Sequence, residues 1–367
     1  MNISGTSSND QLIGTALSDV INGLAGSDRL EGLDGDDVLN GGDGNDSGLI
    51  LAAQRAGLFG GAGNDTLNGE AGDDFLSPGV GNYVVDGGVG FDVLGFDFAT
   101  ATTAIAISYT NIAGTTVGSN TIRNIEAVAV NTGSGNDSII VTATSAPATS
   151  FGNAFQINGN YISSGAGNDT ISSGAGIDLL LGGDGDDAIN GGAGNDSGLT
   201  NFATSVGGTI GAQRAGLFGG AGNDTLNGEA GDDFLNGGIG NDILSGGNGS
   251  DQFVFDSGVI FAASIGVDRI TDFTVSADRI VLDKTTFTAL TTVAGSTLNA
   301  SEFAVVNSAI NGASLAGSSV ARIVFNSATG DLFYNQDGSV SGLGSGGRYA
   351  TLTGITSLAT TSFLVQA

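Results

Sequence analysis

Cysteine and histidine are both absent from this chain of 367 residues. Without them the chain can form no disulfide, no zinc site of the usual kind, no thiol nucleophile and no Ser/His/Asp catalytic triad. Basic residues are scarce as well, since nine lysines and arginines stand against 38 acids and leave a net charge of −29. Such a chain repels phosphates, so nucleic acid is not an expected partner, whereas cations are.

Long apolar runs are missing too. No stretch of 18 apolar residues occurs, so we expect no helix that crosses a membrane. The first residues, MNISGTSSND, have neither a basic start nor an apolar stretch, and we therefore expect no cleavable signal peptide there. Proline is limited to two residues and glycine shows no three-residue period, which excludes a collagen-like chain.

Glycine is abundant, with 66 residues, and much of it follows a nine-residue period. Residues 219–254 read GGAGNDTLN, GEAGDDFLN, GGIGNDILS and GGNGSDQFV. Each unit has glycine at its first and fourth positions, aspartate at the sixth and a large apolar residue at the eighth. Because glycine allows positive φ and the last three residues can extend, each unit predicts a turn followed by a short strand. Two units would make one coil.

The period places carboxylates above one another. After one coil of two units Asp224 would lie against Asp242, and Asp233 against Asp251. Stacked carboxylates repel unless a cation lies between them, and hard oxygen ligands with carbonyls freed by glycine turns suit Ca²⁺. The alternative is that each aspartate caps its own turn by accepting a hydrogen bond from a nearby amide. Four units in unbroken phase favour calcium.

This pattern resembles the calcium-binding nonapeptide of the RTX (repeats-in-toxin) family. The resemblance implies an all-β fold, a parallel β-roll or β-helix solenoid followed by a C-terminal strand-rich capping domain, with several bound Ca²⁺ ions. The predicted metal ligands are the sixth-position aspartates Asp10, Asp19, Asp28, Asp37, Asp46, Asp65, Asp74, Asp92, Asp137, Asp169, Asp178, Asp187, Asp196, Asp224, Asp233, Asp242 and Asp251. Tyr83 occupies a sixth position, so we expect one ligand to be lost there.

Four regions follow from the phase of the repeats. Residues 1–95 form a first block, and residues 164–254 form a second block that duplicates it, since QRAGLFGGAGNDTLNGEAGDDFL occurs in both. Between them, in 96–163, alternating apolar residues replace the glycines. Asp92 and Asp137 lie 45 residues apart, five times nine, so we expect the coil to continue here with few calcium turns. An independent strand domain is the alternative.

An insertion interrupts each block. The fourth unit of each block has glycine at the apolar position, Gly48 and Gly198, and we expect a loop to leave the coil there. The second insertion is nine residues longer, which suggests one added strand and turn. Arg55 and Arg214 occur in both copies, and either a shared binding role or recent duplication explains them.

Residues 255–367 contain less glycine and several strand-like runs, such as RIVF at 322–325. This region resembles the C-terminal domain that follows RTX repeats in secreted proteases such as serralysin. That resemblance implies an uncleaved type I secretion signal, a type I transporter as partner, and a location outside a bacterium or on its surface.

The leading functional hypothesis is a secreted protein that folds on meeting extracellular calcium and serves, without enzymatic activity, in a surface layer, matrix or self-assembling filament. Residues 1–13 are expected to be either a frayed cap or an open parallel edge that docks on a neighbouring copy. An adhesin or a calcium-dependent ligand-binding exoprotein is the alternative. A polysaccharide lyase or epimerase is a weaker one, because Lys284 is the single lysine and Tyr83, Tyr109 and Tyr161 form no clear constellation with Arg123.

Overall fold

The computed structural model describes residues 1–46, 56–109, 115–117, 120–141, 149–151, 155–157, 159–197, 199–203, 209–310, 312–338 and 342–367. The chain divides into two compact units, which we describe separately. Unit 1 comprises Met1–Gly165, Thr170–Leu180 and Gly198–Ala215, and unit 2 comprises Ala166–Asp169, Leu181–Ser197 and Gly216–Ala367. Strands dominate both units, which confirms the predicted all-β class.

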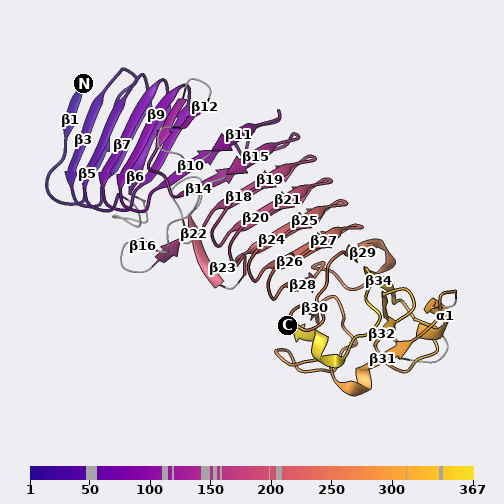
Figure 1. Cartoon of the computed structure of the whole chain (residues 1–367). Helices are drawn as coiled ribbons and strands as arrows, with labels where there is room; N and C mark the ends of the chain where they lie inside the picture. The colour runs from indigo at the N-terminus through magenta and orange to yellow at the C-terminus, as the bar shows by residue number, and fades with distance from the viewer. Residues whose placement is uncertain are drawn as a thin grey trace. The chain divides into compact units, whose positions relative to one another are not determined.

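Unit 1 is a roll of short strands that alternate between facing sheets (Figure 1). The first sheet has the order β1 (Asn2–Ser4), β3 (Val20–Ala25), β5 (Val38–Asp43), β7 (Asp65–Ala71), β9 (Tyr83–Val89), β13 (Asn120–Arg123) and β12 (Thr115–Val117). The second contains β2 (Gln11–Ile13), β4 (Arg29–Asp34), β6 (Gly57–Ala62), β8 (Phe75–Val80), β10 (Val93–Asp97), β14 (Ala127–Asn131) and β18 (Tyr161–Ala166). A third begins with β11 (Ala106–Tyr109), β15 (Ser138–Val141) and β19 (Thr170–Ser172).

The eighth-position residues fill the space between the first two sheets. On the first sheet Ile21 pairs with Leu39, and Leu39 with Leu67, in parallel register. On the second, Leu30 pairs with Leu58 in the same way. All five side chains are fully buried. Each contributes about 1.5–3 kcal/mol by leaving water, so one apolar residue per unit makes a narrow core.

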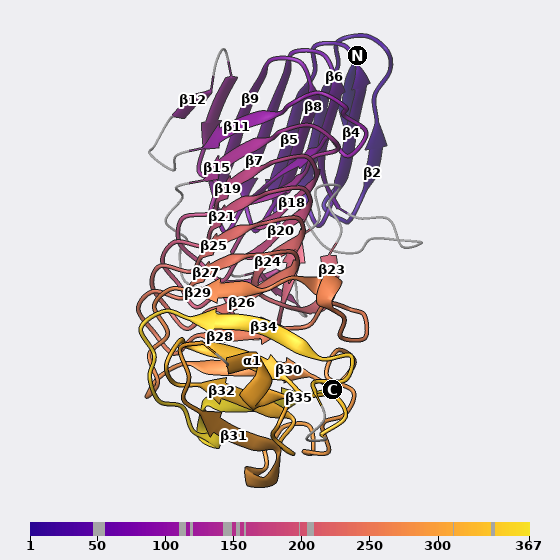
Figure 2. The same ribbon diagram turned by 90° about the vertical axis from the view of Figure 1, so that its right-hand side faces the viewer.

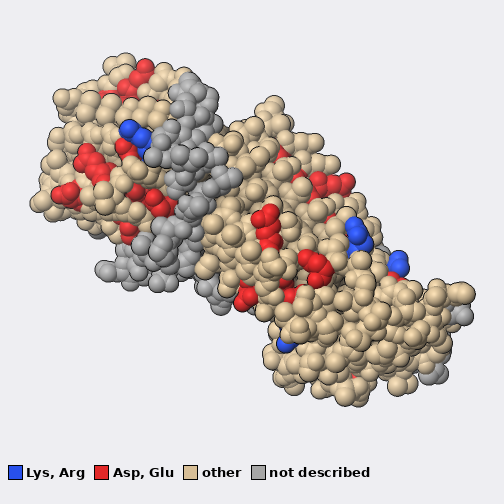
Figure 3. Space-filling model, viewed as in Figure 1, with Lys and Arg blue, Asp and Glu red and all other residues tan. Residues whose placement is uncertain are grey.

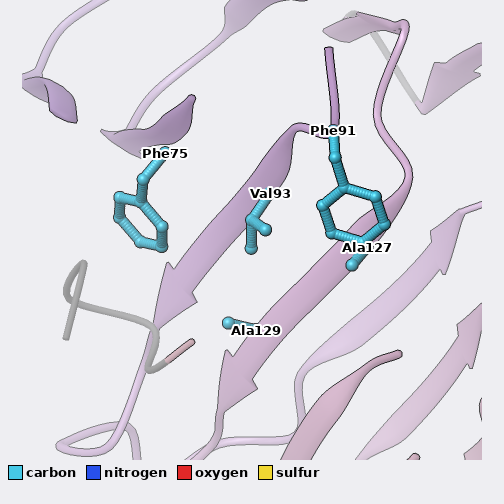
Figure 4. Close-up of a cluster of buried hydrophobic side chains, with 5 residues drawn as sticks. All are labelled: Phe75, Phe91, Val93, Ala127 and Ala129. Atoms are coloured by element: carbon cyan, nitrogen blue, oxygen red, sulfur yellow. The ribbon is translucent and has the colours of Figure 1, made fainter. Parts of the chain in front are cut away.

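Strands β8, β10 and β14 also bury side chains on their outer face. Phe75, Val93 and Ala127 lie in register on these strands, with Phe91 and Ala129 beside them (Figure 4). Because neighbouring residues of a strand point to opposite faces, this cluster lies on the side of the sheet opposite the inward-facing leucines. Burial on both faces explains why the sequence here loses its glycine and polar pattern and becomes AVAV.

The parallel pairing of β10 with β14 and of β14 with β18 spans the stretch in which the glycine pattern is missing. The region boundaries predicted at 95, 163 and 254 remain predictions. Two antiparallel hairpins, β16 (Thr149–Phe151) with β17 (Phe155–Ile157) and β22 (Leu199–Ala203) with β23 (Thr209–Arg214), form separate small sheets. The second insertion therefore contains a hairpin. Gly48, Arg55, Gly198 and the side chain of Arg214 lie outside the described residues.

Unit 2 continues the same construction. One sheet contains β24 (Gly216–Ala221), β26 (Phe234–Ile239), β28 (Gln252–Phe255), β30 (Arg279–Asp283) and β35 (Phe363–Gln366). The other contains β21 (Ala188–Asn190), β25 (Thr225–Asn227), β27 (Ile243–Ser245), β29 (Asp268–Ile270), β34 (Gly347–Leu352), β33 (Asp331–Tyr334), β32 (Ile323–Asn326) and β31 (Phe303–Val306). Strand β20 (Leu179–Asp184) crosses the boundary between the units.

The strands after residue 254 extend both sheets of unit 2 (Figure 2). Strand β30 pairs with β28 and β35 with β30, while β34 pairs with β29, all in parallel. A short helix, α1 (Gly312–Ala316), packs on β31 to β33, and three single turns of 3₁₀-helix lie at Ala263–Ile265, Ala300–Glu302 and Thr360–Ser362. The aromatic rings of Phe261, Phe287, Tyr334 and Tyr349 pack edge to face or tilted and fill the centre of this region.

Candidate metal centre

The sixth-position aspartates of unit 1 form two columns, one along each row of turns. The first column contains Asp10, Asp28, Asp46, Asp74 and Asp92, and the second contains Asp19, Asp37 and Asp65. The main-chain N–H of each aspartate donates to Oδ1 of the next one along its column, at 2.7–3.0 Å. One coil separates the partners, which are 18 residues apart, or 28 where the first insertion intervenes.

Unit 2 repeats the arrangement. One column contains Asp169, Asp187, Asp224, Asp242 and Asp268, and the other contains Asp196, Asp233, Asp251 and Asp278. The N–H of Asp224 donates to Oδ1 of Asp242 at 2.9 Å, and that of Asp233 donates to Oδ1 of Asp251 at 3.0 Å. The stacking predicted from the nine-residue period is therefore confirmed. Their role as ligands remains a prediction.

The second carboxylate oxygen, Oδ2, distinguishes these aspartates from ordinary turn caps. Among the described residues, ten of them have an Oδ2 that is buried and accepts no hydrogen bond: Asp28, Asp37, Asp46, Asp65, Asp74, Asp92, Asp187, Asp224, Asp242 and Asp251. An acceptor buried without a partner costs about 1–3 kcal/mol, and more if it is charged. A row of such oxygens therefore calls for a cation.

All ten of these oxygens lie beside the first glycine of their own unit, and most also lie near a main-chain carbonyl of the next coil. A Cβ atom placed on Gly60 would lie 2.5 Å from Oδ2 of Asp65 and 2.5 Å from the carbonyl oxygen of Pro78. A Cβ atom on Gly69 would likewise meet Oδ2 of Asp74 and the carbonyl oxygen of Gly87. Glycine is required here because any side chain would fill the space in which two oxygens converge.

These donors fit calcium. Carboxylate and main-chain carbonyl oxygens are the ligands that Ca²⁺ accepts in flexible geometry. No three acidic side chains converge on one point in the part of the chain that the structure describes. A cation held beside Oδ2 would draw further ligands from the main-chain carbonyls that the glycine turns bring close to it.

Burial raises the pKa of the column aspartates. The pKa of Asp46 rises to about 8, that of Asp74 to about 7 and that of Asp92 to about 9, because burial disfavours the charged form and neighbouring acids add repulsion. In unit 2, burial likewise raises the pKa of Asp224 and of Asp251 to about 7. At neutral pH the metal-free columns therefore resist full ionisation, and a bound cation would relieve that resistance.

Two of the predicted ligands are engaged as the alternative interpretation describes. Oδ2 of Asp10 accepts hydrogen bonds from the N–H and hydroxyl of Thr6, at 2.6 and 2.9 Å, and Oδ2 of Asp19 accepts the same pair from Thr15. Both units carry threonine at the second position, where the other units have glycine, leucine or glutamate. These two aspartates cap their own turns.

The remaining predicted ligands, Asp137 and Asp178, are buried. In the middle of unit 1 they continue the ladder, by which we mean the hydrogen bonds from a main-chain N–H to the side-chain oxygen of the next coil. Asp137 accepts the N–H of Ile105 at 2.7 Å, and Asp178 accepts that of Asn160 at 2.6 Å. Tyr83 pairs in register with Asp65, at the place where the sequence predicted a lost ligand.

Five described residues that belong to the columns were missed by the nine-residue pattern. One is Asn120, whose Oδ1 accepts the N–H of Tyr83 at 2.8 Å. Glu126 accepts the N–H of Asp92 at 2.8 Å, and Asn160 accepts that of Val128 at 2.9 Å. Asp268 and Asp278 extend the columns of unit 2 beyond the last full repeat. The sequence does contain a signal for Asp268 and Asp278, since isoleucine follows each of them two residues later. This is the spacing between the sixth and eighth positions of a repeat, here without the repeat's glycines.

Four stretches of the chain, residues 13–47, 58–85, 163–197 and 218–253, match the RTX calcium-binding nonapeptide repeat. The chain carries RTX repeats. All the predicted ligands except Asp10, Asp92 and Asp137 fall within these stretches. RTX repeats are known to bind calcium, which agrees with the oxygen donors of the columns. No curated protein matches the chain. Among the described residues no helix has the length and apolar character needed to cross a membrane.

Proposed function

We propose that this calcium-binding β-roll protein is secreted and folds when it meets extracellular calcium, and that it then serves outside the cell as a structural component and not as an enzyme. The observation that carries the proposal is the row of buried Oδ2 atoms without hydrogen-bond partners. Each one disfavours the folded chain until a cation binds, so folding and calcium binding are one process.

Calcium binding to the folded chain alone would shift the folding equilibrium toward the folded state. A cation that binds only the folded state stabilises it by RT ln(1 + [L]/Kd), about 2.7 kcal/mol per site at a hundredfold excess over Kd. Extracellular calcium modules commonly have Kd values of about 10⁻⁴ to 10⁻³ M. The free energy gained by burying the narrow core is small compared with the conformational entropy that is lost when the turns become ordered. The chain would therefore stay unfolded at cytosolic calcium levels and fold outside.

Secretion is supported by the repeats themselves, since RTX proteins are typically secreted. An unfolded, calcium-free chain is also the form that a type I transporter would pass. We place the protein outside the cell or on its surface on these grounds, with the region after residue 254 as the segment that the transporter recognises.

A structural role is supported by how the roll uses its polar groups. The aspartates at the sixth position form the columns, and the asparagines at the ninth position also stack on one another. Nδ2 of Asn40 donates to Oδ1 of Asn22, and Nδ2 of Asn68 donates to Oδ1 of Asn40, both at 2.8 Å. Repeated polar ladders stabilise a regular scaffold, which suits a surface layer, matrix or filament made of several copies.

Light scattering combined with circular dichroism tests this proposal. The full chain is titrated from chelator into millimolar calcium. Strand signal that appears together with large assemblies supports a self-assembling structural protein. Strand signal from a protein that stays monomeric at high concentration rejects the structural role and favours the alternative, an adhesin or ligand-binding exoprotein. Strand signal that is complete in chelator rejects calcium-triggered folding.

A further inference from the structure

The roll of unit 1 changes its construction where Tyr83 replaces an aspartate. The first sheet ends there, with β13 as its last parallel strand, and the third sheet begins with β11. Strand β11 pairs in parallel with β15 and is the first strand of its sheet (Figure 2). The two sheets do not continue into one another, so side chains from both surround the space between them.

That space is a cavity of about 320 Å³. Its walls include Tyr83, Phe96, Phe98, Ile107 and Ile122. The rings of Tyr83 and Phe96 lie 5.9 Å apart, and Phe96 stacks on Phe98 at 6.0 Å with an interplanar angle of 14°. The cavity is partly open to solvent, and its volume is typical of a ligand-binding site.

The edge of β11 lies beside the cavity and carries main-chain groups that face away from β15. The carbonyl oxygen of Ile105 accepts the N–H of Ser138 at 2.9 Å, so Ile105 and Ile107 direct their main-chain groups toward β15. Because these directions alternate along a parallel strand, the N–H and C=O groups of Ala106 and Ser108 face the opposite side. Among the described residues no strand pairs with that side of β11. Ala106 and Ser108 are also exposed and line the cavity.

We propose that β11 and this cavity bind an extended, basic peptide segment of a partner protein. Its main chain adds to the free edge of β11 as a new strand, and one aromatic side chain enters the cavity. A free strand edge supplies affinity and an adjacent pocket supplies specificity in this mode of recognition. The surface of the roll is acidic, and the chain carries a net charge of −29, so lysines flanking the apolar residue would favour association (Figure 3). None of the column aspartates lines this cavity.

The probe is a short fluorescent peptide that alternates threonine and valine, with one central phenylalanine and a lysine at each end. Fluorescence anisotropy measures its binding to the full chain in saturating calcium. We expect saturable binding that weakens at least about tenfold when serine replaces the central phenylalanine, as for a buried aromatic anchor. Methylation of the main-chain nitrogens that face β11 should weaken it as much. These two changes lie in the peptide and leave the protein intact.

A matched pair of protein variants locates the site. Ser108→Pro removes the outward-facing N–H of an edge position, where proline is tolerated, and Ser108→Ala keeps it. The proline variant should bind the peptide at least about tenfold more weakly, while the alanine variant stays within about twofold of the parent. Absence of saturable binding overturns the proposal. Binding of the methylated peptide that is as tight as that of the unmethylated peptide also overturns it. So does equal binding to the two Ser108 variants when both have the circular dichroism of the parent.

Discussion

Asp74 and Asn160 hold equivalent places in two coils of unit 1 and differ in what they leave unpaired. Oδ1 of Asp74 accepts the N–H of Asp46 at 2.8 Å, and Oδ1 of Asn160 accepts that of Val128 at 2.9 Å. Oδ2 of Asp74 is buried without a partner. Nδ2 of Asn160 instead donates to the carbonyl oxygen of Ser173 at 2.9 Å. One oxygen accepts the N–H of the preceding coil in both cases, and of the two residues only the aspartate has a buried oxygen that a cation would satisfy.

The comparison separates two tasks that the repeat sequence combines. The ladder needs a side-chain acceptor at the sixth position, which aspartate, asparagine and even glutamate provide. Calcium needs a second, anionic oxygen and a glycine that leaves space beside it. We expect coils with both features to depend on calcium, and coils with the first alone not to.

The largest effect is expected from Asp74→Ala, which removes both functions. The unpaired N–H of Asp46 alone costs about 1–3 kcal/mol, and the lost calcium adds to that. Urea unfolding in saturating calcium measures the change. Asp43→Ala is the control, because it removes the same charge from an exposed position of the roll. Equal stability of the two variants would mean that the column makes no special contribution.

Gly60→Ala should act next most strongly. The added methyl group meets Oδ2 of Asp65 and the carbonyl oxygen of Pro78, so the turn must open and the unfolding free energy should fall by about 1–3 kcal/mol. Isothermal titration should also show one calcium site weakened or lost. The control is Gly347→Ala in β34, where a Cβ atom would meet only Phe261 at 3.9 Å. A calcium isotherm unchanged from the parent would reject the proposed position of the ion.

Asp74→Asn keeps the acceptor and removes the anionic oxygen, as at Asn160. We expect calcium binding to this coil to weaken at least about tenfold, because ligand charge sets affinity in such sites. The calcium-free chain should become more stable, because a buried charge is gone. Titration calorimetry and unfolding in chelator measure the two effects. A less stable calcium-free variant would contradict this account.

Asn160→Asp is the reverse exchange and should have a smaller effect. It removes the donor that bonds to Ser173 and places a second carboxylate beside Asp178. We expect the calcium-free chain to lose about 1 kcal/mol, as one unpaired buried acceptor predicts. Added calcium should not restore this loss, because residue 155, the first position of this unit, is phenylalanine and not glycine. Melting temperatures with chelator and with calcium test this. Full recovery in saturating calcium would show that an anionic oxygen creates a site without the glycine.

Acidification should stabilise the calcium-free chain gradually. The pKa values of Asp46, Asp74 and Asp92 are raised in the folded chain, so it binds protons more tightly than the unfolded chain does. The stabilisation of the folded chain by these bound protons is fully present below the unfolded pKa near 4. It is lost as the pH rises through the folded pKa values of about 7 to 9. Strand signal in chelator should therefore increase from pH 9 to pH 5, above the isoelectric point near 4.1. An increase in the opposite direction would contradict the raised pKa values.

The sequence predicted the columns because their geometry is local. Two nine-residue units make one coil, so the spacing of Asp224 and Asp242 already contains their stacking. The positions of Asn160 and Glu126 could not be predicted in this way. Each pairs across more than 30 residues that do not keep the nine-residue glycine period, and the partner depends on how the intervening chain folds. The same holds for the cavity beside Tyr83, which forms only because two sheets end next to one another.

The most direct test is a crystal structure of the chain grown in calcium, with an anomalous difference map collected at a wavelength where calcium scatters. The account predicts peaks beside Oδ2 of the column aspartates, such as Asp74 and Asp224, within bonding distance of a main-chain carbonyl oxygen. It predicts no peak beside Asn160. A map with no peaks along the columns, or with peaks of equal height at Asp74 and Asn160, would contradict it.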